Sequence, residues 1–373
     1  MAELFDVAIA GGGPAGAAAA LTLARHGRRV LLADAAPADA FHVGEGLPPT
    51  ARSLLQELGV LDRFHDDGHR ISHGNVSVWG SNEPQSVDYM LQAHAHGYQL
   101  DRPRFDAMLK DAAREAGAVV CDRTRLTRQD EENAGQPMRL QLSSAGETRT
   151  TACRWLVHAG GRAAATLRYH GVTRHRTDRL IAFYTVLHGD DGSDRDGRTM
   201  IEAGADGWWY SVLLPSCERL VVYLCDHDVA PAERAALLSI DGFRDRLRGA
   251  PHISQMCRLH GYRLVRAPRG ADASSGRLER FAGDAWLAVG DAALSFDPLS
   301  SQGISNALYT GMLGARAIDA ALNGRIERLE HYKQHLARIY DAYLRHRATF
   351  YGYEMRWRER PFWQRRHVAL ASL

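Results

Sequence analysis

The hydrophobic pattern at the start of the chain predicts a strand, a helix and a second strand in close succession. The apolar run at 5–10 predicts a buried strand, the Ala- and Leu-rich stretch at 17–26 a helix, and RRVLLAD at 28–34 another strand. Near the other end, the apolar run at 285–289 again predicts a buried strand, and apolar residues then recur at helical intervals over 304–318. Strands that alternate with helices indicate a parallel sheet covered by helices.

The middle of the chain has a different pattern. From about 176 to 263, polar and apolar residues alternate in several short runs separated by Asp/Gly turns, which predicts a mostly antiparallel sheet. The chain then returns to the first pattern and finishes with an amphipathic helix over 327–353. We therefore predict an α/β fold with a discontinuous Rossmann-like domain, an inserted and mainly antiparallel β-sheet domain, and a helical C-terminal tail. The predicted boundaries are 1–70, 98–165 and 278–325 for the first, 71–97 and 166–277 for the second, and 326–373 for the third.

A glycine-rich turn joins the first strand to its helix. GGGPAG at 11–16 has the spacing G-x-G-x-x-G, and the second strand ends in an acid, Asp34. Such glycines permit a tight turn and the close approach of a pyrophosphate to the helix N-terminus, while the acid accepts hydrogen bonds from ribose hydroxyls. The candidate dinucleotide-binding residues are Gly11, Gly13, Pro14, Ala15, Gly16 and Asp34.

A second loop near the C-terminal end has a related character. The stretch 288–306, AVGDAALSFDPLSSQGISN, passes from a strand through an acidic turn and an Asp-Pro turn into the N-terminus of a helix. Backbone N–H groups arranged in this way can surround an electron-rich ligand. The candidate ligand-binding residues here are Gly290, Asp291, Pro298, Ser301, Gly303 and Ile304.

Composition narrows the class of protein. A net charge of +2 over 373 residues, with no dense basic stripe, argues against a nucleic-acid partner. Five cysteines without a CxxC pair indicate a reducing compartment, without structural zinc or another metal site. No leader sequence and no long apolar run are visible, so we expect a cytoplasmic protein without stable membrane insertion. The oligomeric state stays open.

Three separated motifs together resemble the FAD-dependent monooxygenases of the aromatic-hydroxylase type. These motifs are GGGPAG at 11–16, DRPRFD at 101–106 and GDAALSFDPLSSQG at 290–303. Three others, GEGLPP at 44–49, GWWYSVLLP at 207–215 and FYGYEMRWRERPFWQRR at 350–366, resemble the tryptophan-halogenase-like branch. Within that branch the chain is most similar to flavoproteins that modify a tryptophan of a partner polypeptide during tryptophylquinone cofactor maturation.

The resemblance implies an FAD site shared between the two ends of the chain. The glycine turn and Asp34 would hold the ADP half, Arg102 would lie near the phosphates or the ribityl chain, and Asp291 would bind the ribityl and pyrophosphate region. The loop 298–303 would lie by the pyrimidine edge of the isoalloxazine, where a helix N-terminus stabilises the negative charge of reduced flavin. An external reductant, either NAD(P)H or reduced flavin, and O2 would complete the reaction. Whether the FAD is covalently attached stays open.

The implied reaction is hydroxylation of an electron-rich aromatic ring, a tryptophan of a partner protein or peptide, through a C4a-hydroperoxyflavin. Glu45 is the first candidate for assisting proton transfer, followed by His73 and His158. Each has a structural alternative, since Glu45 can cap the helix after it and a histidine can be a hydrogen-bonded core residue. The candidate substrate contacts are Trp208, Tyr210 and Phe296, and the first two can equally be plain core.

Two other reactions fit the same fold. Halogenases of this branch use a lysine in the strand after the GE-x-x-x-P segment, whereas ISHGNVSVWG at 71–80 has none, and the chain's two lysines, Lys110 and Lys333, lie elsewhere. The halogenase motif W-x-W-x-I-P is also not reproduced at 207–215, so halogenation is disfavoured. An FAD-dependent reductase or dehydrogenase is the other alternative. The basic and aromatic segment 356–366 either docks a polypeptide or folds back on the FAD domain, that is, the Rossmann-like domain.

Overall fold

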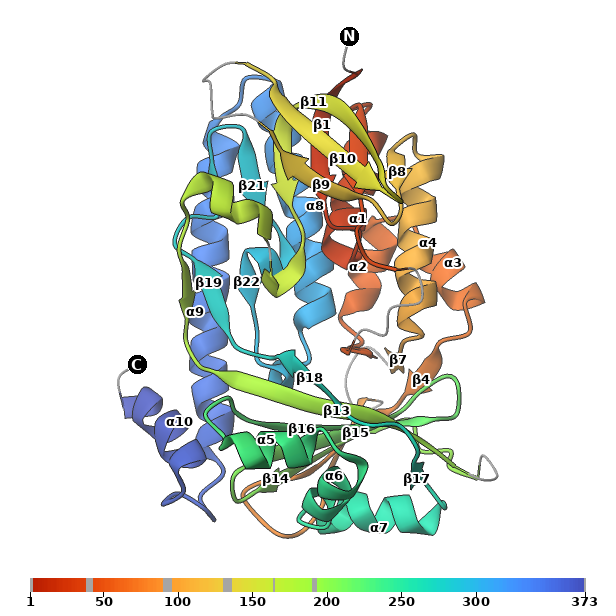
Figure 1. Ribbon diagram of the computed structural model, residues 1–373, viewed down its shortest axis with the longest axis vertical. Coiled ribbons are helices and arrows are strands. Elements are labelled where there is room, and N and C mark those ends of the chain that lie inside the picture. Colours follow the sequence, from red (N-terminus) through yellow and green to blue (C-terminus); the bar gives the residue numbers. More distant parts are fainter. Residues whose placement is uncertain are drawn as a thin grey trace.

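Two sheets of different type divide the molecule, and a long helix connects them. The computed structural model describes residues 3–37, 43–89, 96–129, 136–163, 165–189 and 193–371. Figure 1 shows a parallel sheet with its helices in the upper half, an antiparallel sheet in the lower half, and α9 (Glu327–Gly352) running from one to the other. We call these halves the parallel-sheet domain and the antiparallel-sheet domain. The predicted α/β class is confirmed.

The parallel-sheet domain brings five strand ends to one edge. Its strand order is β20-β21-β11-β1-β2-β8, and all neighbouring pairs except β20 with β21 are parallel. The carboxyl ends of these parallel strands therefore lie side by side, and the loops that follow them share one edge of the sheet. The strands are β1 (Glu3–Ala10), β2 (Val30–Ala33), β8 (Val119–Cys121), β11 (Glu147–His158), β20 (Ala282–Gly283) and β21 (Trp286–Ala288), with β9 (Arg125–Arg128) and β10 (Met138–Ser144) added as an antiparallel extension.

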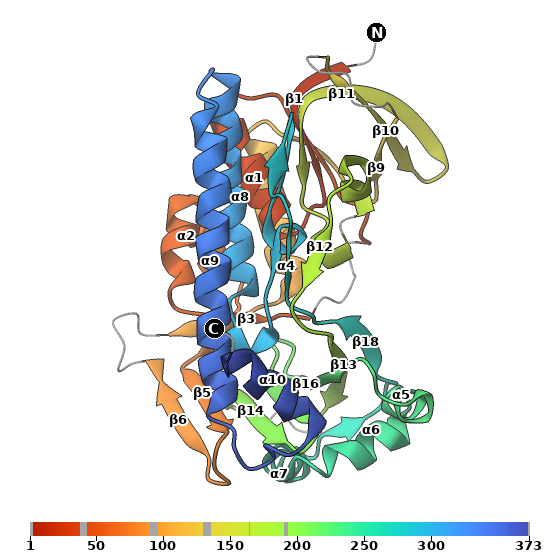
Figure 2. The ribbon, with the colours of Figure 1, turned by 90° about the vertical axis from the view of Figure 1, so that its left-hand side faces the viewer.

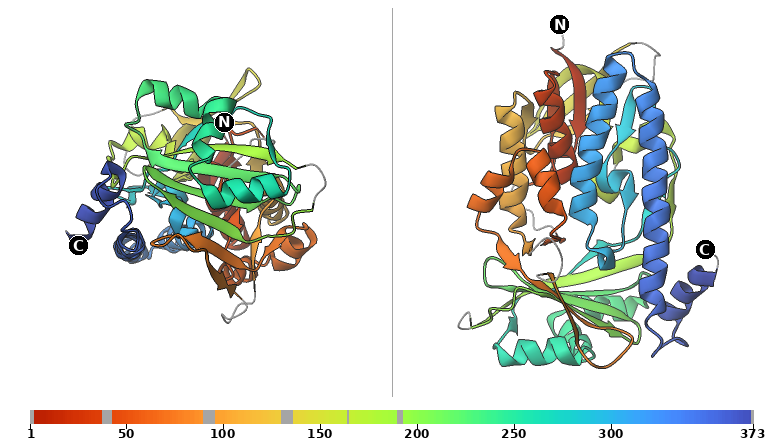
Figure 3. Two further views of the ribbon diagram at one scale, coloured as in Figure 1. Left: turned by 90° about the horizontal axis from the view of Figure 1, so that it is seen from below. Right: turned by 180° about the vertical axis from the view of Figure 1, so that it is seen from behind.

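Helices cover one face of this sheet, and two of them, α1 (Pro14–Arg25) and α8 (Gly303–Leu322), are rich in small residues. The helices α4 (Arg102–Glu115), α1, α8 and α9 lie in a row (Figure 3, right). Alanine and glycine let α1 and α8 approach closely: a Cβ added to Gly311 of α8 would lie 2.3 Å from the backbone oxygen of Ala15. Two short helices, α2 (Ala51–Glu57) and α3 (Leu61–Asp66), complete this layer. The N-terminal residues of α1 are thus held against the C-terminal third of the chain.

The antiparallel-sheet domain has the strand order β17-β13-β16-β15-β14-β5-β6, and β18 also pairs with β13. Only the contact between β5 and β14 is parallel among these pairs of the described residues. The strands are β5 (Gly74–Val78), β6 (Gln85–Asp88), β13 (Leu180–His188), β14 (Thr199–Gly204), β15 (Gly207–Leu213), β16 (Arg219–Asp226), β17 (Arg263–Leu264) and β18 (Arg269–Asp272).

One part of this domain differs from the sequence prediction. The region 176–263 was expected to hold only strands and turns, but it also contains three short helices, α5 (Pro231–Leu237), α6 (Ile240–Leu247) and α7 (Pro251–Leu259). They cover the outer face of the sheet (Figure 1), where Trp209 and Tyr223 of the sheet are buried together with Phe243 of α6. Both faces of the sheet are therefore packed.

Two three-stranded sheets lie between the domains. One has the order β3-β7-β4, with β3 (Gly46–Leu47), β4 (Arg70–Ser72) and β7 (Gly97–Gln99), and the other has the order β12-β19-β22, with β12 (Arg174–Arg176), β19 (Gly276–Leu278) and β22 (Leu294–Ser295). The tail continues from α9 into α10 (Pro361–Ala371), which packs beside the antiparallel sheet (Figure 2). Within the described residues, no helix is long and apolar enough to cross a membrane, and no group of His, Cys, Asp and Glu is arranged to hold a metal ion.

Candidate FAD site and domain interface

The glycines of the first turn have different roles. Gly11 has a φ of +115°, and a Cβ there would lie 2.4 Å from the Ala159 oxygen. A Cβ on Gly16 would lie 1.9 Å from the Gly11 oxygen, so both positions are glycine because the backbone packs closely. A Cβ on Gly13 would meet nothing within 4 Å, and no side chain caps the helix that begins after it at Pro14. This open helix N-terminus fits a pyrophosphate.

Asp34 lies next to this turn, at the carboxyl end of β2. A Cβ on Gly12 would lie 2.6 Å from the Asp34 carboxylate. The carboxylate accepts hydrogen bonds from the Lys110 Nζ at 3.1 Å and from the Ala36 backbone N at 3.2 Å, and Lys110 also donates to Asp122 at 2.8 Å. Asp34 is therefore held in place beside the glycine turn and the open N-terminus of α1, as a ribose-binding acid requires.

The second loop lies directly against the first. Gly290, with a φ of +58°, is so close to α1 that a Cβ would lie 2.7 Å from the Ala15 Cβ. The next residue, Asp291, is partly exposed and forms an ion pair of 2.6 Å with Arg162 on the short 3₁₀ segment η2 (Gly161–Ala163). Arg162 was not among the sequence candidates. It follows β11, whose end lies beside that of β1, so the strand order identifies it where a linear motif does not.

The loop 298–303 leads to a second open helix N-terminus. A 3₁₀ turn, η5 (Pro298–Ser300), is followed by Ser301 in the left-handed region at φ +50°, and α8 begins at Gly303 without a side-chain cap. A Cβ on Gly303 would meet nothing within 4 Å, whereas Ile304 is buried in the core. The open backbone at 301–303 fits an electron-rich ring edge, and Ile304 anchors the helix behind it.

Buried side chains of α9 fix the shape of this loop. The Asp297 carboxylate is 1% exposed; it accepts a hydrogen bond from the Leu299 backbone N at 3.0 Å and one from the Tyr351 hydroxyl at 2.8 Å. Arg347 lies between Asp297 at 3.3 Å and Asp178 at 3.0 Å. Burial raises the pKa of Asp297, and the Arg347 guanidinium opposes that rise. Residues of α9 thus hold the loop 298–303 in place.

Glu45 is a buried carboxyl group between the two domains. It is 2% exposed and directly precedes β3; its Oε1 accepts a hydrogen bond from the Gly44 backbone N at 3.0 Å. Arg102, at the start of α4, donates to the Gly44 oxygen at 2.8 Å and pairs with Asp106 at 3.1 Å. Burial raises the pKa of Glu45 to about 7, and the positive charge of Arg102 limits the rise. A carboxyl group with this pKa can both donate and accept a proton near neutral pH.

The interface next to Glu45 is apolar. Half-buried side chains from loops of the parallel-sheet domain and from the inner face of the antiparallel sheet pack against one cluster, and we call this set the interdomain lining. It consists of Val43, Val186, Ile201, Tyr210, Ala271 and Leu299, together with the buried carboxyl of Glu45 beside Tyr210. The pKa of Tyr210 lies well above its usual value because of burial and the nearby Glu45 carboxylate. The lining therefore combines apolar surface with one carboxyl and one phenol.

The other two substrate candidates are core residues in the structure. Trp208 is fully buried, and its indole N–H donates to the Tyr351 hydroxyl at 3.0 Å. Phe296 is buried and stacks on Tyr343 with ring centroids 4.4 Å apart. Of the three, only Tyr210 belongs to the interdomain lining.

The two histidine candidates lie in different surroundings from Glu45. His73 is exposed to solvent between β4 and β5. His158 is fully buried, with its Nδ1 2.7 Å from the Thr166 hydroxyl and its Nε2 2.9 Å from the His170 Nε2. Burial holds the pKa of His158 well below its usual value. Because neighbouring side chains occupy both ring nitrogens, the geometry favours a structural role for His158.

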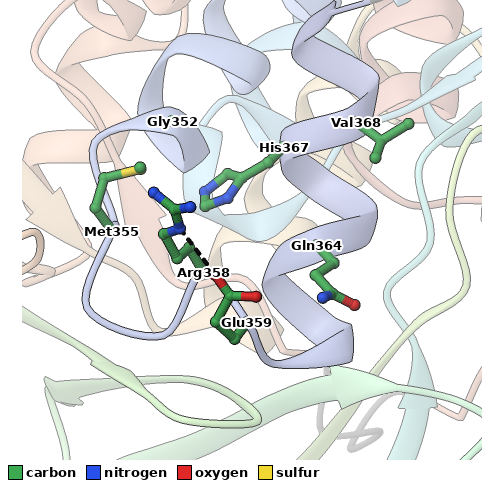
Figure 4. A pocket seen from close by; sticks show the side chains of 7 residues that line it. All are labelled: Gly352, Met355, Arg358, Glu359, Gln364, His367 and Val368. Carbon is green, nitrogen blue, oxygen red and sulfur yellow. Dashed lines mark hydrogen bonds and ion pairs between the residues drawn. The ribbon is translucent and has the colours of Figure 1, made fainter.

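The basic residues of the tail are paired within the protein. Arg356 forms an ion pair with the fully buried Glu354, and Arg366 pairs with Asp226 at 2.9 Å on the antiparallel sheet. The tail thus folds back, but on the antiparallel-sheet domain. Beyond these pairs, the elbow between α9 and α10 has a surface pocket of about 610 Å³ that includes Met355, Arg358 and His367 (Figure 4). Its lining residues all belong to the tail, so it is separate from the FAD site.

The site combines two open helix N-termini, an acid at the end of β2 and the Asp291 loop packed against the glycine turn, and this arrangement fits a dinucleotide cofactor. The chain belongs to the FAD binding domain family, whose profile matches residues 5–346. It is 30% identical to the protein named FAD-dependent oxidoreductase LodB of Marinomonas mediterranea, over 98% of both chains. It is 26% identical to a tryptophan 2-halogenase of Chondromyces crocatus, over 98% of this chain and 71% of that one.

A solved structure supports the same fold. The peptidyl tryptophan dihydroxylase QhpG, which is essential for tryptophylquinone cofactor biogenesis, superposes with a TM-score of 0.78 at 23% identity. The match covers 98% of this chain and 79% of that chain. The protein is thus a flavin-dependent oxidoreductase whose cofactor is FAD, with the fold of the halogenases and aromatic hydroxylases.

Proposed function

We propose that the protein is an FAD-dependent monooxygenase that hydroxylates an electron-rich aromatic ring. The observation that carries this proposal is the interdomain lining, which is apolar apart from the carboxyl of Glu45 and the phenol of Tyr210. Apolar walls suit an aromatic ring, and an indole or phenol that attacks an electrophilic oxygen needs little more than proton transfer. FAD supplies the oxygen chemistry: an external donor, NAD(P)H or reduced flavin, reduces it, and the reduced form then reacts with O2.

The residues of this chain would divide the remaining tasks. The glycine turn and Asp34 would hold the ADP half, and Asp291 with Arg162 the ribityl region. The loop 298–303 would face the ring system. Glu45 would take the proton that the substrate ring loses after oxygen transfer, because its pKa near 7 leaves much of the group ionised at neutral pH.

We further propose that the ring is a tryptophan of a partner protein or peptide. The similarity in fold to QhpG, which acts on a peptidyl tryptophan, supports this choice. LodB, which has a length similar to this chain, is a sequence relative outside the halogenases. Nucleic acid is not a partner in this proposal, since the arginines of the tail pair with acidic residues of the protein.

Halogenation is the second candidate, because a tryptophan 2-halogenase is a sequence relative. The positions of the two lysines argue against it. Lys110 is engaged with Asp34 and Asp122, and Lys333 is paired with Glu330 on the surface of α9. A lysine that delivers an oxidised halide is therefore missing from the interdomain lining.

A single-turnover experiment separates these reactions. Holoenzyme reduced with dithionite is mixed with O2 and a tryptophan-containing peptide, with and without bromide, and the peptide is analysed by mass spectrometry. We expect a mass gain of oxygen that does not depend on bromide, and a lower yield for Glu45→Gln. A brominated peptide that forms only with bromide would establish the halogenase instead. Peptide that is unchanged, or that only loses hydrogen, would contradict hydroxylation of this substrate.

A further inference from the structure

An array of aromatic rings extends from the interdomain lining to the surface of the tail. Ring centroids are 6.2 Å apart between Tyr210 and Trp208 and between Trp208 and Trp79, 5.4 Å between Trp79 and Trp363, and 6.2 Å between Trp363 and Trp357. We call these five residues the tryptophan array. It contains four of the seven tryptophans of the chain, drawn from three distant segments.

The array has an inner and an outer end. At the inner end, Tyr210 belongs to the interdomain lining together with Leu299 of the loop 298–303. Trp208 and Trp363 are fully buried, whereas Trp79 and Trp357 are half-buried. Hydrogen bonds fix the three inner indoles in orientation: their N–H groups donate to the Tyr351 hydroxyl at 3.0 Å, the Phe350 oxygen at 2.9 Å and the Gly204 oxygen at 2.9 Å. Aliphatic side chains could fill this volume, but they could not lose an electron.

We propose that the tryptophan array carries single oxidising equivalents from the flavin site to the protein surface. An oxygen-activating flavoenzyme can form a peroxide-derived oxidant when its substrate is absent. That oxidant, a hydroxyl radical, takes one electron from Trp208, either directly or through Tyr210, and one proton from water, so that it becomes water. Each ring is then reduced in turn by the next one outward. The electron vacancy, that is, the ring that lacks one electron, ends on Trp357, and the N–H proton of this indole passes to water. A small reductant such as ascorbate returns the electron and water returns the proton, so Trp357 is restored and the reductant is oxidised by one electron.

Chemistry sets the direction of this transfer. Indole and phenol side chains give up an electron only to strong oxidants, so the array cannot pass electrons from a nicotinamide donor to ground-state flavin. The charge around the outer end is balanced. The Arg356 guanidinium lies 4.3 Å from the centroid of the Trp357 ring, and Glu354 pairs with that guanidinium. A positive vacancy on Trp357 therefore does not face an unpaired cation.

Light provides a test that needs neither substrate nor O2. In the oxidised holoenzyme, a blue flash makes the bound FAD a strong one-electron oxidant, and transient absorption follows the indole radical. In wild type we expect a radical whose lifetime shortens with added ascorbate. Trp357→Phe and Trp363→Phe should lose this ascorbate dependence, because the vacancy can no longer reach the surface and returns to the flavin. Trp357 is half-buried, so its variant tests the array with little effect on the core.

Trp209 offers a matched control. It is the sequence neighbour of Trp208, but it lies on the opposite face of β15 and packs on Tyr223 at 4.5 Å. Trp209→Phe should behave as wild type. The proposal is overturned if both array variants keep the wild-type ascorbate dependence, or if Trp209→Phe loses it. Because the flash experiment depends only on bound FAD, its outcome is independent of whether the enzyme hydroxylates, halogenates or dehydrogenates.

Discussion

Replacing Glu45 by glutamine should change how the stability of the protein depends on pH. Burial raises the pKa of this carboxyl from 4.5 to about 7, so the folded protein binds the proton more tightly than the unfolded chain does. The resulting cost is absent below pH 4.5, grows as the pH rises, and is complete above about pH 7. Since one pKa unit is worth about 1.4 kcal/mol, ionisation of Glu45 destabilises the fold by about 3 kcal/mol at pH 8. Glutamine keeps the shape of the side chain without this cost.

Urea unfolding of wild type and Glu45→Gln at pH 5 and pH 8 measures the effect. The difference in unfolding free energy between the two proteins should shift in favour of the variant by most of about 3 kcal/mol between the two pH values. Other titrating groups are common to both proteins and cancel. A difference that is the same at both pH values would refute the reasoning and show that Glu45 titrates as an exposed carboxyl does. In single turnovers, wild type should also lose yield below pH 7, where Glu45 is protonated, whereas the low yield of the variant should not change with pH.

Four further substitutions test the remaining contacts. Gly13→Ala should leave the melting temperature of the apoprotein unchanged, because its Cβ enters open space at the helix end, but it should weaken FAD binding by about tenfold or more in a fluorescence titration. Gly16→Ala is the contrasting variant: its Cβ would collide with a backbone oxygen, so it should lower the melting temperature. Asp291→Ala should cost about 2 kcal/mol of FAD binding free energy, and unchanged affinity would remove Asp291 from the site. Tyr351→Phe leaves the Trp208 indole N–H without its acceptor and removes one of the hydrogen bonds to the Asp297 carboxylate, so urea unfolding should show a loss of about 3 kcal/mol.

Local patterns predicted the parallel-sheet domain well. The strand and helix periods at 5–34, the glycine spacing and the helix at 327–353 each depend on neighbouring residues, and the structure has β1, α1, β2 and α9 there. The helices α5 to α7 were missed because each is nine residues or shorter, so each has too few turns for a helical period to stand out among the neighbouring strands.

Contacts between distant segments could not be read from the sequence. Arg162 reaches Asp291 because β11 lies beside β1 and β21 in the sheet, and the order of strands is not a local property. The same holds for Trp208, whose aromatic character fitted both a substrate contact and the core. Its indole reaches Tyr351, which belongs to the tail, and this contact makes it core. The sequence supplied the residue types, and the long-range packing decided their roles.

The loop 290–303 depends on α9 for its shape, and this dependence sets the order in which the enzyme is assembled. The glycine turn at 11–16 emerges from the ribosome long before its counterpart at 290–303. Asp297 within that loop then waits for Arg347 and Tyr351. A nascent chain that lacks α9 therefore has no complete cofactor cradle, and we expect FAD to be captured only after α9 has been synthesised and has packed against the loop. The docking of α9 therefore precedes cofactor binding in the assembly of the enzyme.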